Sequence, residues 1–317
     1  MAENTRQSAI QADQLLIGLL YLVVPIIQAV FYLPCMLVMR NDPELNQHSC
    51  IKLMYHLGLA DFFSMTLQMI SGLLTITDWA RLCPYWLNQM FGALLVGFGW
   101  GTYLVLIHVI ALNRCTIMCF PPHWQSMLFS IKATNVNKLW LAMAWLYGLL
   151  WMTLCLTPWG AFIYIPSLYT WYFDPSKHWY NILINVNWWQ DALILNGSFV
   201  WYIIILFYMR FVLSTELLDV SEERKEERKI VAQAALICLY TLLWDQYWHI
   251  APLLTDWQYA YALGNLFWIS NSAINPLVYL TLNRRISRKV GQKLKFGSEN
   301  KVQPAAVNTR QVGGGEV

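Results

Sequence analysis

Four ionisable side chains interrupt the long apolar stretches of this 317-residue sequence: Asp61, Arg114, Asp191 and Asp245. A charge inside hydrocarbon is costly, so such residues usually face a partner, an ion or a polar cavity. Arg114 ends its stretch, where the guanidinium can reach helix-end carbonyls or an incoming partner. These residues predict binding or switching inside an apolar bundle. For Asp191 and Asp245, contact with water near helix ends is the alternative.

A polar hinge is predicted in the segment 271–279, which has the sequence NSAINPLVY. Pro276 removes one helical hydrogen bond, and the Asn275 side chain can bond the freed backbone. Asp61 is the acid that such a cluster needs as a partner across a helix bundle. The predicted network comprises Asp61, Asn271, Ser272, Asn275, Pro276 and Tyr279.

Two chemical alternatives can be weighed from the residues alone. His56 and Asp61 have the spacing of a base and its orienting acid in some membrane acyltransferases. Residues five apart on a helix point to different faces, since each residue turns by about 100°. A retinal pigment needs a Lys for its Schiff base, and the stretch 259–282 contains none. We therefore predict no enzyme and no cofactor.

The elements that must position these residues are apolar helices. The chain is 57% hydrophobic and 12% charged, about half the charged share of a soluble domain. Continuous apolar runs long enough to cross about 30 Å of hydrocarbon favour helices over a barrel. Seven occur, at 15–39, 51–76, 85–111, 139–164, 192–213, 230–254 and 259–282. The predicted fold is an all-α membrane protein with a seven-transmembrane helix bundle.

The distribution of positive charge predicts the orientation of this bundle. Of the 21 Lys and Arg residues, three lie in one set of connections and eighteen in the alternate set and the carboxyl tail. The richer set is expected in the cytoplasm, which places the amino terminus outside. The formal net charge of +3 is too small to predict nucleic-acid binding.

The chain is expected to divide into four parts. Residues 1–14 form the extracellular amino terminus, and residues 15–282 the transmembrane domain. Residues 283–296 place Ile286, Val290 and Leu294 on one stripe among basic residues, which predicts a short amphipathic helix on the inner membrane surface. Residues 297–317 have the composition of a disordered cytoplasmic tail.

The acid at 61, the Arg at 114 and the NPxxY motif at 275–279 together resemble the rhodopsin-like G-protein-coupled receptors. The resemblance implies a heterotrimeric G protein as partner, docking at Asn113, Arg114 and Pro121. It also implies that Tyr279 rearranges on activation around the Pro276 hinge. Asp61 with Asn271, Ser272 and Asn275 would bind sodium and water, and no other metal is expected. Tyr103 replaces a small hydroxyl that usually completes that sodium site.

A narrower likeness extends over most of the chain. Its segments are YLPCMLVM at 32–39, NR at 113–114 with CFP at 119–121, LYGL at 146–149, WYFDP at 171–175 and LTLNR at 280–284. They resemble the nematode serpentine receptor class T (Srt) chemoreceptor family. The resemblance implies a chemosensory receptor for a small-molecule ligand, in the plasma membrane of sensory neurons and their cilia. A ligand-gated channel or a small-molecule transporter is the alternative function.

The sequence departs from the rhodopsin-like pattern at several positions. Asn113 replaces the acid that usually pairs with the neighbouring Arg, a role that Glu226 or Glu227 could take over. Cys83 has no partner Cys in the loop 165–190, so the usual extracellular disulfide is not expected. Trp244 is only an approximate substitute for the usual aromatic switch.

Aromatic and sparsely polar residues of the outer halves predict a cavity for the ligand. Core packing and interface anchoring are the alternative roles for each ring. The predicted pocket residues are Trp100, Tyr103, Asn187, Trp188, Asp191, Trp244, Trp248 and His249.

Overall fold

The computed structural model describes residues 2–77, 83–129, 134–211, 222–255, 257, 259–281 and 283–299. Its helices are α1 (Ala2–Asn41), α2 (Ser49–Ile76), α3 (Tyr85–Leu94), α4 (Thr102–Cys119), α5 (Pro122–Leu128), α6 (Thr134–Cys155), α7 (Tyr180–Phe211), α9 (Glu222–Leu254), α10 (Ala260–Thr281) and α11 (Arg284–Glu299). Short 3-10 turns cover Leu45–Gln47 and Pro166–Leu168. The strands β1 (Phe162–Ile165) and β2 (Thr170–Phe173) form an antiparallel hairpin.

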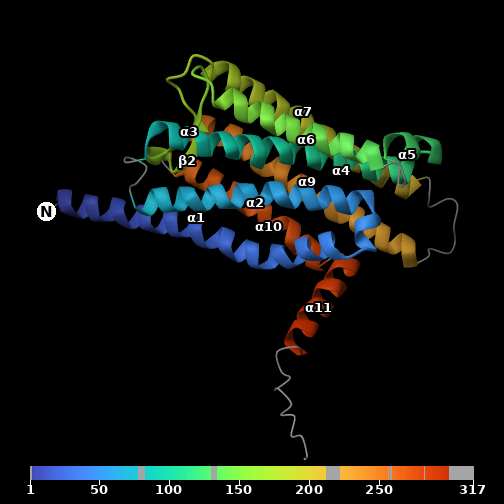
Figure 1. Ribbon diagram of the computed structural model, residues 1–317. Helices are drawn as coiled ribbons and strands as arrows, with labels where there is room; N and C mark the ends of the chain where they lie inside the picture. Colours follow the sequence, from blue (N-terminus) through green and yellow to red (C-terminus); the bar gives the residue numbers. More distant parts are fainter. Residues whose placement is uncertain are drawn as a thin grey trace, which may run out of the picture.

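The long helices run side by side as a bundle, and α11 projects away from one end (Figure 1). A π-helical segment, Leu95–Gly101, joins α3 and α4 into one continuous rod. Within the described chain, seven rods result: α1, α2, α3 with α4, α6, α7, α9 and α10. The predicted all-α seven-helix bundle with an additional helix at its carboxyl end is therefore confirmed. We call its two ends the hairpin end, which carries β1 and β2, and the α11 end.

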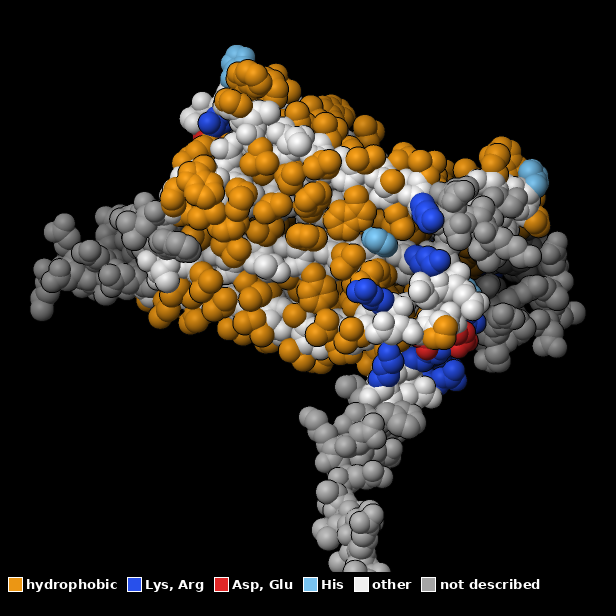
Figure 2. Space-filling model, in the orientation of Figure 1, with side chains coloured by type: hydrophobic (Ala, Val, Ile, Leu, Met, Phe, Trp, Pro, Cys, Tyr) orange, Lys and Arg blue, Asp and Glu red, His pale blue; other side chains and the backbone are white. Residues whose placement is uncertain are grey.

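The outer surface of the bundle is apolar (Figure 2). Large hydrophobic side chains are exposed along α1, α6 and α7, among them Leu16, Leu146, Leu193 and Phe207. Five rods of the described chain meet the length and composition needed to cross a membrane. Such a surface is stable only when lipid covers it, so the chain is a multi-pass membrane protein.

Two helix boundaries differ from the sequence prediction. The fourth apolar stretch ends as a helix at Cys155, because Pro158 and Gly160 follow and the chain turns into β1. Helix α7 begins at Tyr180, twelve residues before the predicted start at 192. Its first turns carry Asn185 and Asn187, which lower the hydropathy of this window; Asn185 is exposed and Asn187 is half-buried.

The hairpin is attached to α3 by hydrogen bonds and close packing. The Asn88 amide donates to the Tyr164 carbonyl at 3.0 Å and accepts from the Tyr164 backbone N–H at 2.8 Å. A Cβ at Gly92 would lie 1.8 Å from the Phe162 carbonyl oxygen, so only glycine permits this approach. All seven cysteines, including Cys83, are free thiols. Polar contacts and close packing therefore hold the hairpin in its place.

Helix α11 is attached at both its start and its middle. Asn283 caps its first turn, accepting from the Ile286 N–H at 3.2 Å. Lys289 lies 2.7 Å from Asp42 and 2.6 Å from Glu44 in the connection between α1 and α2. Hydrogen bonding to Lys289 lowers the pKa of both carboxyl groups. Lowered acid pKa values mean that this attachment is complete at neutral pH and is lost only as the pH falls below the ordinary carboxylate range.

The attachment of the hairpin predicts the response to one substitution. Asn88→Ala should lower the free energy of unfolding by about 1–3 kcal/mol, because two buried backbone groups of Tyr164 lose their partner. Thermal unfolding of the purified protein measures this change. Asn196→Ala is the matched control, since Asn196 is exposed and bonds only a carbonyl of its own helix. Dithiothreitol should leave the wild-type transition unchanged, and a large shift with the reductant would contradict this description.

Candidate functional site

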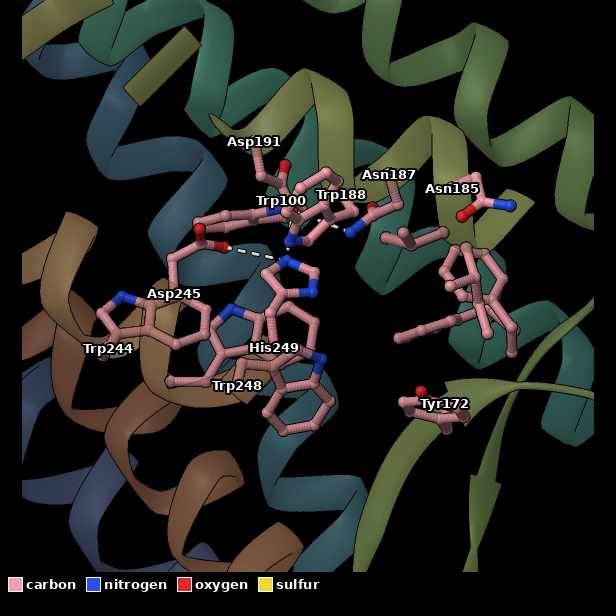
Figure 3. A pocket seen from close by; sticks show the side chains of 15 residues that line it. Trp100, Tyr172, Asn185, Asn187, Trp188, Asp191, Trp244, Asp245, Trp248 and His249 are labelled. Carbon is pink, nitrogen blue, oxygen red and sulfur yellow. Dashed lines mark hydrogen bonds and ion pairs between the residues drawn. The ribbon is translucent and has the colours of Figure 1, made fainter. Parts of the chain in front are cut away.

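A cavity of about 350 Å³ opens at the hairpin end, between α7, α9 and the π-helical segment (Figure 3). The hairpin contributes Tyr172 and Phe173 to its wall, and α10 contributes Trp268. The complete lining is Val96, Trp100, Phe162, Tyr172, Phe173, Ile184, Asn185, Asn187, Trp188, Asp191, Trp244, Asp245, Trp248, His249 and Trp268. A mostly aromatic cavity with a few convergent polar groups is typical of small-molecule sites.

Seven of the eight residues predicted for this pocket line the one cavity: Trp100, Asn187, Trp188, Asp191, Trp244, Trp248 and His249. The prediction was wrong for Tyr103, which does not line the cavity. Its ring is stacked on that of Trp100 with the ring centres 5.7 Å apart. The predicted pocket did not include Asp245, which the sequence had already singled out as an intramembrane acid; it is four residues before His249 and therefore on the same helical face. The hairpin aromatics gave no pattern in the sequence.

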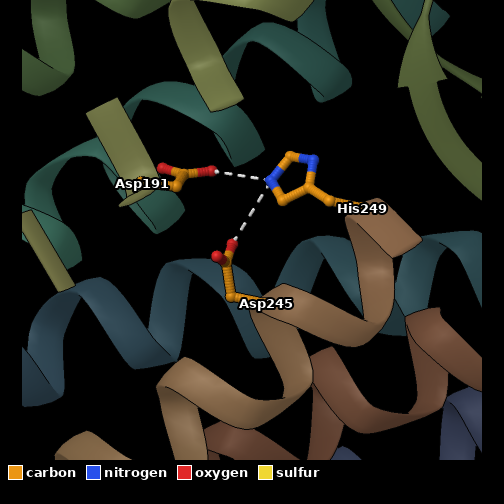
Figure 4. Close-up of side chains that lie close together, drawn as sticks. All are labelled: Asp191, Asp245 and His249. Carbon is orange, nitrogen blue, oxygen red and sulfur yellow. Dashed lines mark ion pairs between the residues drawn. The ribbon is translucent and has the colours of Figure 1, made fainter. Parts of the chain in front are cut away.

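Three titratable side chains converge at the polar end of the cavity (Figure 4). His249 Nε2 lies 3.6 Å from Asp191 Oδ2 and 3.6 Å from Asp245 Oδ1. Both acids are almost fully buried, with 1% and 2% of their surfaces exposed. Asp191 is positioned by Trp100 Nε1 at 3.1 Å and by Asn187 Nδ2 at 2.7 Å. The cluster joins α7 to α9 and concentrates negative charge beside an apolar cavity.

Indole rings separate this cavity from the centre of the bundle. Trp244 and Trp268 are stacked 6.0 Å apart, and Trp100 meets them edge-on at 5.0 and 6.0 Å. The three rings come from α9, α10 and the π-helical segment, so a molecule in the cavity rests on three rods at once. A change in one ring must be accommodated by the others because protein interiors are closely packed.

A polar path continues below the indole rings. The Tyr103 hydroxyl meets Thr241 Oγ1 at 3.1 Å, and Thr241 donates to Asn271 Oδ1 at 2.8 Å. All three side chains are buried, and they join α4, α9 and α10. Asn271 begins the polar segment that was predicted as a hinge, so the path connects the cavity floor to that segment.

Asp61 is the common acceptor of a second group of buried hydrogen bonds, which we call the Asp61 hub. Its Oδ2 accepts a hydrogen bond from Tyr32 at 2.8 Å and another from Asn275 at 2.7 Å. Ser272 is also within hydrogen-bonding reach of this carboxylate. Tyr32 was not predicted, because a single Tyr in an apolar helix gives no signal of its partner. The structure therefore brings Asp61, Ser272 and Asn275 together, with Pro276 buried in the adjoining turn of α10.

The atoms around Asp61 can be compared with the ligands that the predicted sodium site would need. A cation would need free oxygen ligands, but two protein donors already converge on Asp61 Oδ2. Tyr103 directs its hydroxyl toward Thr241 and supplies no small hydroxyl beside the acid. Asn275 Oδ1 is nevertheless buried without a hydrogen-bond partner, so one oxygen ligand remains free beside Asp61, and sodium binding there stays a prediction.

Arg114 lies at the α11 end of α4. It lines a small cavity of about 40 Å³ together with Tyr202 of α7 and Tyr279 of α10. Among the described side chains, no carboxylate forms an ion pair with Arg114. The side chains of Glu226 and Glu227, predicted as substitute partners, lie outside the described residues.

The two other residues predicted near the G protein differ in exposure. Asn113 is fully buried, and neither polar atom of its amide has a hydrogen-bond partner within the described chain. Pro121 is exposed and stands at the start of α5, where it positions that short helix. Arg114, Tyr279 and Pro121 therefore lie at the same end of the bundle, opposite the large cavity.

The Asp61 hub predicts the effect of removing one donor. Tyr32→Phe should lower the free energy of unfolding by about 1–3 kcal/mol, because a buried carboxylate oxygen loses a hydrogen bond. Thermal denaturation of the purified protein measures this change, with Tyr208→Phe on α7 as the matched control. In the Asp61→Asn background the cost of Tyr32→Phe should shrink, since a neutral amide needs fewer donors. An unchanged cost in that background would show that Tyr32 acts independently of Asp61.

Comparisons with known proteins agree with this geometry. The crystal structure of squid rhodopsin matches with a TM-score of 0.71 and 17% sequence identity, over 93% of this chain and 89% of that chain. At this identity the likeness shows the fold alone. A search of curated proteins found no significant match. The family model described as "Serpentine type 7TM GPCR chemoreceptor Srt" matches residues 2–303. The chain belongs to this family of serpentine seven-transmembrane chemoreceptors.

Proposed function

We propose that this receptor binds a small molecule in the large cavity and activates a heterotrimeric G protein at the α11 end. The observation that carries the proposal is a path of contacts that leads from the large cavity to the polar segment of α10 predicted as a hinge. It begins at Asp191, passes through Trp100 and Tyr103, and reaches Thr241 and Asn271 through contacts of 2.8–3.1 Å and one stacked ring pair. Family membership supports the same assignment.

The distribution of charge supports the orientation that this function needs. Lys and Arg side chains gather near the α11 end on the face shown in Figure 2. Positive residues concentrate on the cytoplasmic side of membrane proteins, so the α11 end is the G-protein side. The hairpin end then faces the exterior, where the cavity receives its ligand. We expect the plasma membrane of a sensory neuron, including its cilium, as the location.

The mechanism follows from the elements that meet in the cavity floor. A ligand in contact with Trp244 and His249 interacts with α9, and its contact with Trp268 involves α10. Only a ligand with different affinities for two arrangements of these helices can shift their populations. The Pro276 hinge and the Thr241 to Asn271 hydrogen bond are the places where α10 and α9 can change together. Opening between α4 and α9 would expose Arg114 to the G protein.

The role of Arg114 predicts a loss of coupling. Arg114→Ala should reduce G-protein activation about tenfold or more, because a hydrogen bond to a charged group contributes about 1.5–3 kcal/mol. The receptor is expressed in a heterologous or sensory cell, volatile and soluble compounds are screened, and the G-protein signal is recorded. Arg40→Ala, an exposed cation at the same end, is the control. If responses survive both Arg114→Ala and G-protein blockade, a ligand-gated channel or transporter becomes the better explanation.

The unpaired amide of Asn113 predicts basal activity. An acid next to Arg114 would compete with the G protein for the guanidinium, and Asn113 offers no charge to do so. The wild type should therefore signal without ligand, and Asn113→Asp should lower that signal. Asn113→Ala removes the amide without adding charge and should leave the basal signal high. Surface expression is measured for each variant, and equal basal signals from wild type and Asn113→Asp would refute this explanation.

A further inference from the structure

We infer that Asp191, Asp245 and His249 form a binding site for a divalent transition-metal ion such as Zn²⁺, at the polar end of the large cavity. The three donor atoms are one nitrogen and two carboxylate oxygens, all within 4.8 Å of one another. Imidazole and carboxylate together suit zinc and its neighbours in the first transition row.

The distances between the three side chains suit a bound metal ion better than hydrogen bonds between the side chains themselves. At 3.6 Å, neither His249 to Asp191 nor His249 to Asp245 is a hydrogen bond of normal length. A triangle with sides of 3.6, 3.6 and at most 4.8 Å has a centre about 2.4 Å or less from every corner. Bonds from Zn²⁺ to nitrogen and oxygen are about 2.0–2.2 Å long. Small side-chain rotations would therefore bring all three atoms to bonding distance.

The charges of the cluster also favour a cation, because a protonated His249 would offset only one of the two carboxylates. Two nearly buried acids lie within a few ångströms of each other, and none of the residues that line the cavity in the described chain is Lys or Arg. Two carboxylates and a neutral imidazole exactly offset the charge of a divalent ion. Without one, burial and mutual repulsion of the acids are destabilising.

Two polar atoms remain unused at this site. His249 Nε2 is buried without a hydrogen-bond partner, and both acids point toward it (Figure 4). The indole Nε1 of Trp244, a residue 5% exposed that lines the cavity, also lacks a partner. The first atom can bind the metal, and the second is a donor available to a molecule bound beside it.

Neighbouring side chains hold the ligands in position. Trp100 and Asn187 each donate to a different oxygen of Asp191, which fixes the orientation of its carboxylate. Such supporting hydrogen bonds are typical of metal sites. A metal ion can enter between the three side chains, whereas a substituted amine would have to displace His249.

Three protein ligands leave a coordination position open, and the cavity adjoins it. Resting on the proposed function, this position defines a class of chemosensory ligand. Small molecules with thiolate or amine donors would complete the coordination while their apolar parts lie against the indole rings.

The test uses the full-length receptor, purified in detergent without any G protein. Zn²⁺ affinity is measured by competition with a chromophoric chelator, and Co²⁺ is added to record a visible spectrum. The wild type should bind one Zn²⁺ and give Co²⁺ bands of low coordination number. Asp245→Asn and His249→Gln should each lower the affinity about 10- to 100-fold. His178→Gln, which removes an exposed histidine of the hairpin end, should match the wild type.

Each other outcome overturns the inference. Wild-type protein that gives no Co²⁺ spectrum, or variants that bind as tightly as wild type, would exclude the site. The spectrum is decisive even if a variant fails to fold. Binding of methylammonium without binding of Zn²⁺ would identify an organic-cation site instead. Metal binding is measured without a G protein, and signalling is measured in cells, so the two proposals fail separately. A receptor that signals but binds no metal refutes only the metal site. A receptor that binds metal but does not signal refutes only the proposed function.

Discussion

Hydrogen bonds onto the buried carboxylate of Asp61 are the interaction on which the bundle depends most. Tyr32 of α1 and Asn275 of α10 both donate to this acid of α2, so three helices share one buried charge. A bilayer offers no water to replace these donors, and an unpaired carboxylate there would be strongly destabilising. The same contacts lie next to Pro276, which removes one backbone hydrogen bond of α10 at this level of the bundle.

Buried polar groups are satisfied to different degrees in the hairpin, the cavity and the Asp61 hub. At the hairpin end, Asn88 bonds the backbone of Tyr164 and fulfils the structural role of a disulfide. In the cavity, Asp191 is oriented by Trp100 and Asn187, yet its partner acid Asp245 has only a 3.4 Å contact with Gln246. The Asp61 carboxylate thus has two hydrogen-bond donors, although Asn275 Oδ1 lacks a partner, and the cavity retains groups that can bind something else.

Much of the fold and part of the site could be predicted from the sequence. Hydropathy and charge gave the seven helices, because length and apolarity are direct requirements of a bilayer. Intramembrane charge identified Asp61, Arg114 and Asp191. The hairpin at 162–173 could not be predicted, since its strands are short and its attachment depends on Asn88 and Gly92, distant in sequence. The start of α7 was missed because Asn185 and Asn187 in its first turns lower the hydropathy of that window. Tyr103 was misplaced because the sequence does not show that the Trp100 ring closes the cavity above it.

The central claim is that the cavity and the α11 end are coupled through α9. It is tested most directly by the distance between the α11 ends of α4 and α9. Spin labels at Ile117→Cys and Ala232→Cys, both exposed positions, would be introduced with Cys83 and Cys119 replaced by Ser, and pulsed electron resonance would record the distance distribution. A compound that binds the cavity should shift the population toward longer distances, and Asp61→Asn should alter that shift. A distribution unchanged by a bound, signalling compound would contradict the claim.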